Sequence, residues 1–139
     1  MELKILVDHA VRILLYLAEQ KYSVPSKEIA EQLHISQSHV CKIIEILQEE
    51  KVVTVYTEAK GSTELKKKPD TITLLEIIEM MEQKMKIPRH SMEKISGRQY
   101  APILRQIGGD YDGVQKTLDN MLKEVTIQDL LDMEYPCSL

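Results

Sequence analysis

The side chains best suited to chemistry stand together in residues 36–42, at the start of an expected helix. Apolar residues recur there with the helical period of about 3.6 residues, at Val40, Ile43, Ile44 and Leu47. This spacing leaves four polar side chains pointing outward: Gln37, Ser38, His39 and Lys42. Amide, hydroxyl, imidazole and ammonium groups at a helix start can hydrogen-bond to the base edges and phosphates of DNA.

A shorter helix is predicted directly before this one, over residues 26–33. Ile29 and Leu33 lie four residues apart and therefore face one side of it. The turn is His34-Ile35, with Ile35 as its apolar plug, and the Ser36 hydroxyl caps the following helix. The arrangement is typical of the DNA-binding helix-turn-helix, whose second helix, the recognition helix, enters the major groove. An ordinary helical hairpin is the alternative interpretation.

Residues 52–56 are rich in β-branched types, and we predict that they form a strand. Residues 58–61 form a turn, and residues 62–65 return as a second strand. A hairpin that follows a helix-turn-helix is the wing of a winged helix. The expected fold class is therefore mainly α with a small β-hairpin, a winged helix-turn-helix. A hairpin that only covers the edge of the core is the alternative.

The charge distribution bears on whether DNA is the partner. The formal net charge of −4 argues weakly against nucleic acid, but residues 21–70 hold eight lysines and eight acidic residues. Phosphate contacts need a local basic edge, which lysines near the hairpin can supply. The candidate DNA contacts are Ser26, Lys27, Ser36, Gln37, Ser38, His39, Lys42, Lys60, Lys66 and Lys67. For the lysine run at 66–68, a solvated loop is the alternative.

The remaining helices are predicted from periodicity and capping signals. Residues 4–18 form an amphipathic first helix with an apolar face of Ile5, Leu6, Ala10, Ile13, Leu14, Leu17 and Ala18. Thr73 and Glu76 have capping-box spacing and open a helix that extends to about Lys84. Residues 86–109 are the least regular part, and Thr126 opens a last short helix.

A heptad-like seam marks the helix that Asp110 can cap. Its apolar positions follow 3,4,3,4 spacing: Tyr111, Val114, Leu118, Met121 and Val125. Such a seam near the end of a small chain predicts a dimerisation helix that pairs with a second copy. Packing against the chain's own first helix is the alternative.

Composition limits the class of protein. With 139 residues and 43% hydrophobic types, the chain is expected to form one compact domain overall. Residues 1–68 would be the winged helix-turn-helix region, and residues 69–139 a linker, a sensor-like segment and the dimerisation helix. No apolar run is long enough for a membrane span, and no signal-peptide layout is present, so we expect a cytoplasmic protein. Catalytic motifs are absent, so no enzyme is expected.

The cysteines and histidines do not predict a metal site. Cys41 and Cys137 form no CxxC pair, and the four histidines are not at metal-ligand spacing, so neither a metal nor a cofactor is expected. Cys41 lies in the recognition helix, where oxidation would add bulk and polarity against DNA, so it is a candidate redox sensor. A small half-buried residue without a role is the alternative. The basic segment 89–105 can receive an anionic effector metabolite or an acidic partner protein, or it is a solvated face.

Five motifs, taken together and in order, resemble the Rrf-two (BadM/IscR-type) winged helix-turn-helix transcription regulators over residues 8–131. They are DHAVRILLYLA (8–18), SKEIAEQLHIS (26–36), Ile43-Ile44-x-x-Leu47, ITLLEIIE (72–79) and VTIQDLL (125–131). The resemblance implies a bacterial homodimer in which a long C-terminal helix crosses its partner. It also implies that two recognition helices read a near-palindromic promoter site on double-stranded DNA.

The chain departs from the family pattern in two places. The family's wing usually reads Gly-Gly-Tyr-x-Leu, whereas this chain has Gly61-Ser62-Thr63-Glu64-Leu65. Many members bind an iron–sulfur cluster through cysteines that this chain lacks between residues 84 and 110, where Arg105 and Gly108 occupy the matching Cys and His positions. Asp8 matches a carboxylate ligand of one branch, but a carboxylate alone cannot hold a cluster. The resemblance is therefore to the cluster-free branch, which includes a cysteine-metabolism repressor.

The sequence predicts a homodimeric transcription regulator, a repressor without an iron–sulfur cluster that binds a near-palindromic operator. The alternative is a winged-helix protein–protein interaction module that has lost specific DNA binding. The altered wing and the acidic balance favour this alternative, whereas the polar start of the recognition helix and the lysine run favour DNA.

Overall fold

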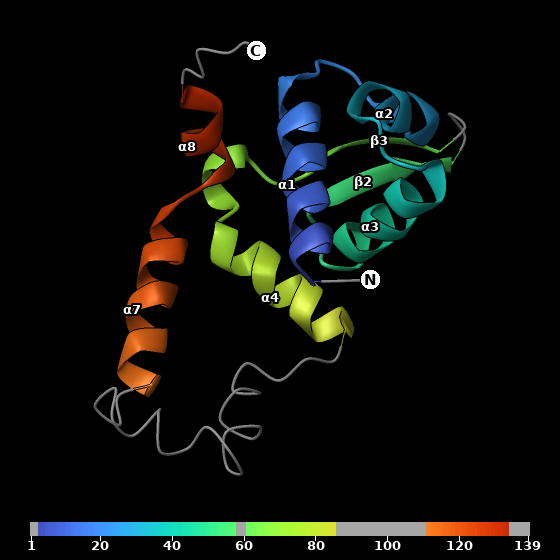
Figure 1. Ribbon diagram of the computed structural model, residues 1–139. Coiled ribbons are helices and arrows are strands. Elements are labelled where there is room, and N and C mark those ends of the chain that lie inside the picture. Colours follow the sequence, from blue (N-terminus) through green and yellow to red (C-terminus); the bar gives the residue numbers. More distant parts are fainter. Residues whose placement is uncertain (1–2, 58–60, 86–110, 134–139) are drawn as a thin grey trace.

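The computed structural model describes residues 3–57, 61–85 and 111–133 (Figure 1). The chain forms, in order, α1 Leu3–Glu19, β1 Val24–Pro25, α2 Ser26–Leu33, α3 Gln37–Glu49 and β2 Val53–Tyr56. It continues with β3 Ser62–Leu65, the 3₁₀ turn η2 Pro69–Thr71, α4 Leu74–Met85, α7 Tyr111–Glu124 and α8 Ile127–Asp132. The predicted mainly α fold with a small hairpin is confirmed. Residues 58–60 of the predicted turn and the whole segment 86–109 lie outside the described residues.

Helix α1 lies at the centre of the fold, where it contacts α2, α3, β3, α4 and α8 (Figure 1). Its buried stripe consists of Leu6, Ala10, Ile13, Leu14 and Leu17, as predicted. The prediction is wrong for Ile5, which is 42% exposed. Each residue advances a helix by about 100°, so Ile5 lies beside the stripe that begins at Leu6 rather than on it.

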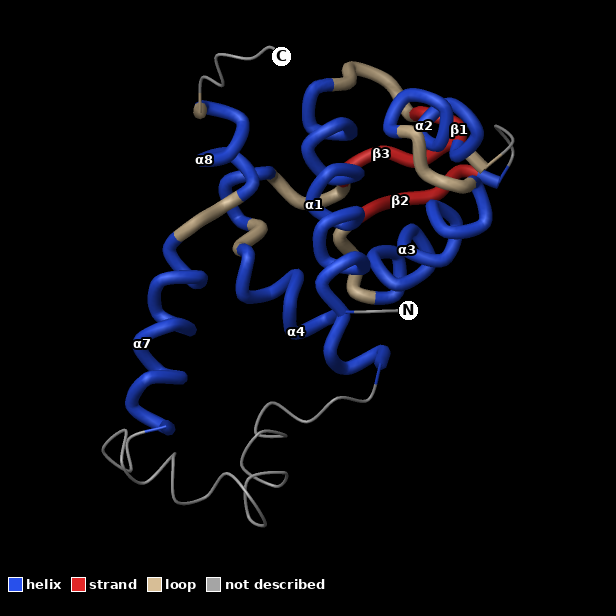
Figure 2. Tube along the Cα trace, viewed as in Figure 1, coloured by secondary structure: helices blue, strands red, loops and turns tan. Residues whose placement is uncertain are grey.

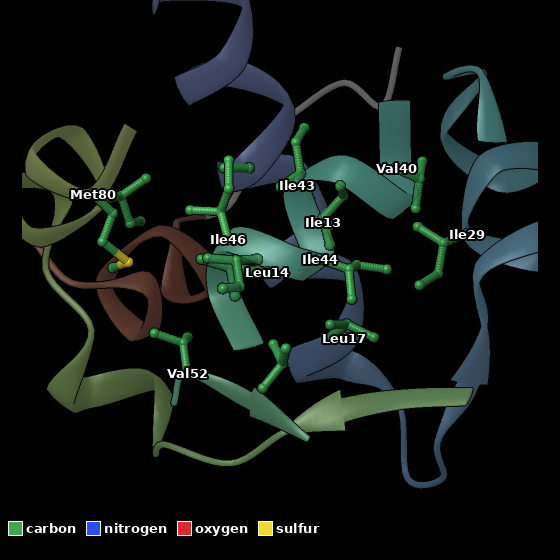
Figure 3. Packing of buried hydrophobic residues seen from close by; sticks show 14 of the residues in the cluster. Ile13, Leu14, Leu17, Ile29, Val40, Ile43, Ile44, Ile46, Val52 and Met80 are labelled. Carbon is green, nitrogen blue, oxygen red and sulfur yellow. The ribbon is translucent and has the colours of Figure 1, made fainter. Parts of the chain in front are cut away.

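The two predicted helices of the helix-turn-helix, α2 and α3, are present. His34 ends α2 in the left-handed conformation with φ of 56°, which reverses the chain between the helices. Ile35 is buried, and its backbone N–H donates to the carbonyl of Ala30 at 3.1 Å. The apolar stripe of α3 is buried as predicted and consists of Val40, Ile43, Ile44 and Leu47. Helix α3 packs against α1 and α2, and Figure 3 shows Val40, Ile43 and Ile44 in this core.

The hairpin of β2 and β3 belongs to a three-stranded antiparallel sheet with the order β1-β3-β2 (Figure 2). Val53 pairs with Leu65 at one end of the hairpin, and Tyr56 pairs with Ser62 at the other. The third strand, β1, was not predicted, because two residues are too few to show an alternating pattern. Pro25 ends it at the sheet edge, where a missing N–H costs no pairing.

The C-terminal segment is joined to the start of α4. Leu74 donates its backbone N–H to the carbonyl of Val125, and Ile127 donates to the carbonyl of Ile72, both at 2.9 Å. Thr73 caps α4 through a hydrogen bond from the Glu76 N–H, as predicted. The following α8 begins with a full capping box between Thr126 and Asp129. Helix α7 packs against α4 on the side away from α3 (Figure 1).

Candidate nucleic-acid interface

The first turn of α3 is capped and polar, as the sequence predicted. Ser36 has extended backbone angles, and its Oγ accepts a hydrogen bond from the backbone N–H of His39 at 3.3 Å. The next two side chains, Gln37 and Ser38, are exposed. A capped helix start carries partial positive charge and presents free donors, which suits contact with a nucleic-acid backbone or base edge.

A side-chain hydrogen bond joins the starts of the two helices. The Nε2 of Gln37 donates to the Oγ of Ser26 at 3.4 Å. Ser26 and Gln37 are the first residues of α2 and α3, so the fold brings two of the predicted DNA-contact residues together on one surface. Lys27 and Lys42 are exposed on the same two helices.

His39 differs from its predicted outward position, because its ring is half-buried against His9 of α1. The two Nδ1 atoms lie 3.0 Å apart, and the rings meet edge to face with centroids separated by 4.8 Å. Burial of the ring, followed by the positive charges of His9 and Lys42, lowers the pKa of His39 below its ordinary value. The contact spans 30 positions in the chain, so no local sequence pattern signals it.

Cys41 is a free, exposed cysteine on α3. This exposure does not agree with the alternative in which it is a half-buried packing residue. The thiol stands two residues after His39, in the fifth position of the helix that begins at Gln37. It is therefore accessible to an oxidant, and its role as a redox sensor stays a prediction. Cys137 lies outside the described residues.

The lysine run lies away from the start of α3. Lys66 and Lys67 donate their backbone N–H groups to the carbonyl of Val52, at 2.9 and 3.3 Å. Val52 stands between α3 and β2, so these lysines lie near the C-terminal end of α3. That end is about 20 Å from Gln37, since the 13 residues of α3 each rise about 1.5 Å.

The lysines at 66–68 contact an acidic residue and line a cavity. Lys67 forms an ion pair with Glu76 at 3.5 Å. The run lines a cavity of about 270 Å³ together with Lys21 and Glu64. These lysines therefore form a basic surface of their own rather than one edge with Gln37. Lys60 lies outside the described residues.

The wing has an acidic side chain where the two strands pair. The Tyr56 hydroxyl donates a hydrogen bond to the Glu64 carboxylate, and this bond and the charge of Glu64 raise the pKa of Tyr56. Gly61 precedes β3 with φ of 76°, a conformation that favours glycine, so this wing glycine is required by the backbone.

The fold and the polar helix start define the class, which is a winged helix-turn-helix protein. The chain belongs to the Rrf2 family, described as "Iron-dependent Transcriptional regulator", whose pattern matches residues 3–133. The family resemblance inferred from the sequence motifs is thus confirmed.

Two relatives carry the name "HTH-type transcriptional regulator NsrR". The protein of Bacillus licheniformis is 28% identical over 136 residues, which cover 94% of this chain and 92% of the relative. The protein of Shouchella clausii is 26% identical over 133 residues, which cover 94% of this chain and 89% of the relative. The similarity to these two transcription regulators therefore covers nearly the whole length of both chains.

Solved structures share the fold. The oxidised form of Staphylococcus aureus CymR has a TM-score of 0.69 at 16% identity and covers 96% of this chain and 98% of its own. The global cysteine regulator CymR of B. subtilis has a TM-score of 0.66 at 21% identity, covering 91% and 92%. The T. potens IscR has a TM-score of 0.66 at 21% identity, covering 91% and 82%.

The family description mentions iron, so the question is whether this chain has side chains that can hold it. Iron–sulfur clusters are held by cysteine thiolates, and this chain has two cysteines. The part of the chain that the structure describes contains no group of three His, Cys, Asp or Glu side chains able to hold a metal ion. Asp8, the candidate carboxylate ligand, forms an ion pair with Arg12 at 3.1 Å. This donor set does not fit an iron–sulfur cluster.

None of the helices among the described residues has the length and apolar character needed to cross a membrane.

Proposed function

We propose that the protein is a homodimeric transcription regulator that binds a near-palindromic operator on double-stranded DNA through the first turn of α3. The observation that carries this proposal is the capped start of α3, where Gln37 is exposed and bonded to Ser26 of α2. Hydrogen-bonding side chains at this position of a helix-turn-helix reach base edges in the major groove. Membership of a family of transcription regulators supports the same role.

The proposal of a homodimer is supported by apolar surface that remains exposed in the single chain. On α7, Leu118 and Met121 are 48% and 61% exposed, and both belong to the predicted seam. A groove of about 560 Å³ is lined mostly by apolar side chains of α1, α4 and α8: Leu3, Val7, Val11, Leu74, Ile78 and Leu130. Large exposed apolar surfaces mark interaction sites. We assign residues 69–139 to dimerisation and sensing, and residues 1–68 to DNA binding.

We propose that the protein represses transcription, because a dimer that is bound to a promoter site excludes other proteins from that site. The resemblance to the cluster-free branch of the family, which includes a repressor, supports this role. The protein would act in the cytoplasm, where the chromosome is accessible, and would respond to an effector metabolite or a partner protein.

A protein–protein interaction module is the second candidate, and two observations favour it. Glu64 places negative charge on the wing, and the lysine run lies far from Gln37. Such a module would not release counterions from DNA, so the dependence of binding on salt distinguishes the two functions.

The test uses DNA selected from a random-sequence library by the immobilised protein. Affinity for the selected site is measured by fluorescence anisotropy from low to physiological salt. A DNA-binding regulator should show a log–log slope of about −0.9 for each phosphate neutralised. If selection recovers no common site and the slope is near zero, the interaction module is the better account.

A further inference from the structure

The contact between His9 and His39 connects the central helix of the fold to the candidate DNA-reading turn. His9 belongs to α1, and His39 is the third residue of α3, two positions after Gln37. Their Nδ1 atoms are 3.0 Å apart, which is hydrogen-bond distance, and both rings are half-buried. His39 is also the residue whose backbone N–H is capped by Ser36. One side chain therefore links the cap of α3 to α1.

The protonation states of the two rings decide whether this contact can exist. A neutral imidazole has one N–H and one acceptor nitrogen, so one ring can donate to the other across the two Nδ1 atoms. A singly protonated pair can form the same bond with charge assistance. When both rings are protonated, two N–H groups and two positive charges face each other. The contact is then lost, so it requires at least one neutral ring.

The surroundings of His39 favour the neutral form of its ring. Burial of the ring lowers the pKa of His39 most, followed by the positive charges of His9 on α1, Lys42 on α3 and the amino terminus. Two ion pairs involve other charged groups of these helices. Asp8 pairs with Arg12 on α1, and Lys84 of α4 pairs with Glu49 at the far end of α3.

On α2, Glu28 accepts a hydrogen bond from the Tyr16 hydroxyl. Acid therefore meets a His39 whose pKa in the folded chain is lowered, first by burial of the ring and then by the neighbouring positive charges. Because the folded pKa lies below the unfolded one, stability from this arrangement is present above the ordinary histidine pKa, about 6.5, and is lost as the pH falls.

We propose that His9 is a positioning residue for DNA reading: it holds His39, and with it the first turn of α3, in the orientation that reads the operator, and acid releases this hold. The inference rests on the proposed function and adds a regulating residue outside the helix-turn-helix. The contact with His9 engages the Nδ1 atom of His39. The hydrogen bond to His9 also sets the tautomer, and thereby whether Nε2 donates or accepts.

Acidification should then change two affinities in opposite directions. A protonated His39 adds positive charge beside DNA, which strengthens binding to any sequence. Loss of the His9 contact leaves the first turn of α3 less fixed, which weakens binding to the selected site in particular. The ratio of selected-site affinity to random-DNA affinity should therefore fall as the pH is lowered from 7.5 to 5.5.

Two substitutions of His9 separate positioning from charge. His9→Ala removes the contact and should reduce the affinity ratio by about tenfold at pH 7.5, the scale of one lost base contact. His9→Asn keeps a short side chain with a carbonyl that can accept from neutral or protonated His39. It should retain the ratio at pH 7.5 and flatten the pH profile. His34→Asn is the matched control, because His34 is exposed and asparagine accepts its left-handed conformation.

A second readout is independent of DNA. The His39 ring is titrated by NMR, in buffer with a chelator so that the two histidines cannot bind trace metal. Removing the neighbouring charge of His9 should raise the pKa of His39 in His9→Ala, while His34→Asn should leave it unchanged. Circular dichroism checks that each variant is folded.

The outcomes are distinct. If His9→Ala leaves the His39 titration unchanged, or keeps the wild-type affinity ratio at both pH values, the positioning role is wrong. If the wild-type chain shows no preference for any selected site, the proposed function fails and this inference fails with it. A raised His39 pKa together with a reduced ratio in His9→Ala, and neither change in His34→Asn, supports the proposal.

Discussion

The Nε2 of Gln37 donates to the Oγ of Ser26 at 3.4 Å, so the first residue of the recognition helix is bonded to the first residue of the helix before it. Both side chains are polar, and Gln37 is exposed. The bond orients the Gln37 amide before any DNA is present, which reduces the side-chain entropy lost on binding. The same surface can therefore hold a phosphate near Ser26 and present an amide to a base edge.

The cap of α3 should contribute measurably to stability. Ser36→Ala removes the acceptor for the His39 N–H, and a lost serine cap typically costs about 0.5–2 kcal/mol. Urea unfolding followed by circular dichroism measures this change. Ser38→Ala, at an exposed position in the first turn of the same helix, is the control and should be nearly neutral. Equal costs for both variants would contradict the capping role.

Dimerisation through α7 can be tested at the seam. Leu118→Asp places a charge on a surface that we expect the second copy to cover, so the dimer should dissociate. Analytical ultracentrifugation reports the species present. Asn120→Asp adds the same charge at another exposed position of α7 and should sediment as the wild type does. The seam is not the dimer contact if Leu118→Asp and wild type sediment alike.

Protein purified without oxygen should be colourless and free of stoichiometric iron. The reason is the donor set, since two cysteines cannot supply the thiolates of the family's cluster. Visible absorption together with iron and sulfide analysis provides the measurement. Cluster absorption with iron and sulfide in stoichiometric amounts would overturn the assignment to the cluster-free branch.

Oxidation of Cys41 should release the protein from DNA. The thiol is exposed on the helix expected to enter the groove, and a mixed disulfide there would collide with the duplex. Treatment with a small disulfide should release wild-type protein from the selected site and leave Cys41→Ser bound. Cys137→Ser is the matched control and should still be released. Equal release of wild type and Cys41→Ser would reassign Cys41 to a passive surface role.

Local signals predicted much of this fold, because its helices carry them strongly. The stripe from Val40 to Leu47 and the caps at Ser36, Thr73 and Thr126 each depend on residues within a few positions. The short strand β1 could not be predicted, since Val24 pairs with Thr63 across the chain.

The candidate site was predicted less completely, for the same reason. Gln37 and Ser38 are exposed as expected, whereas His39 turns toward His9, and the lysine run lies near the opposite end of α3. Each of these differences comes from tertiary packing between distant segments. Periodicity reports which face of a helix is apolar, but it does not report which neighbour meets a polar side chain at the edge of that face.

The central claim is that the first turn of α3 reads DNA sequence, and Gln37→Ala tests it most directly. The measurement is the ratio of affinities for the selected site and for a scrambled duplex of equal length and composition, at one salt concentration. Gln37→Ala should reduce the free-energy difference that corresponds to this ratio by about 1–3 kcal/mol, the scale of a base contact. Gln48→Ala, at an exposed position near the end of the same helix, should leave it unchanged. Equal losses on both duplexes would contradict base reading and would assign Gln37 to phosphate positioning.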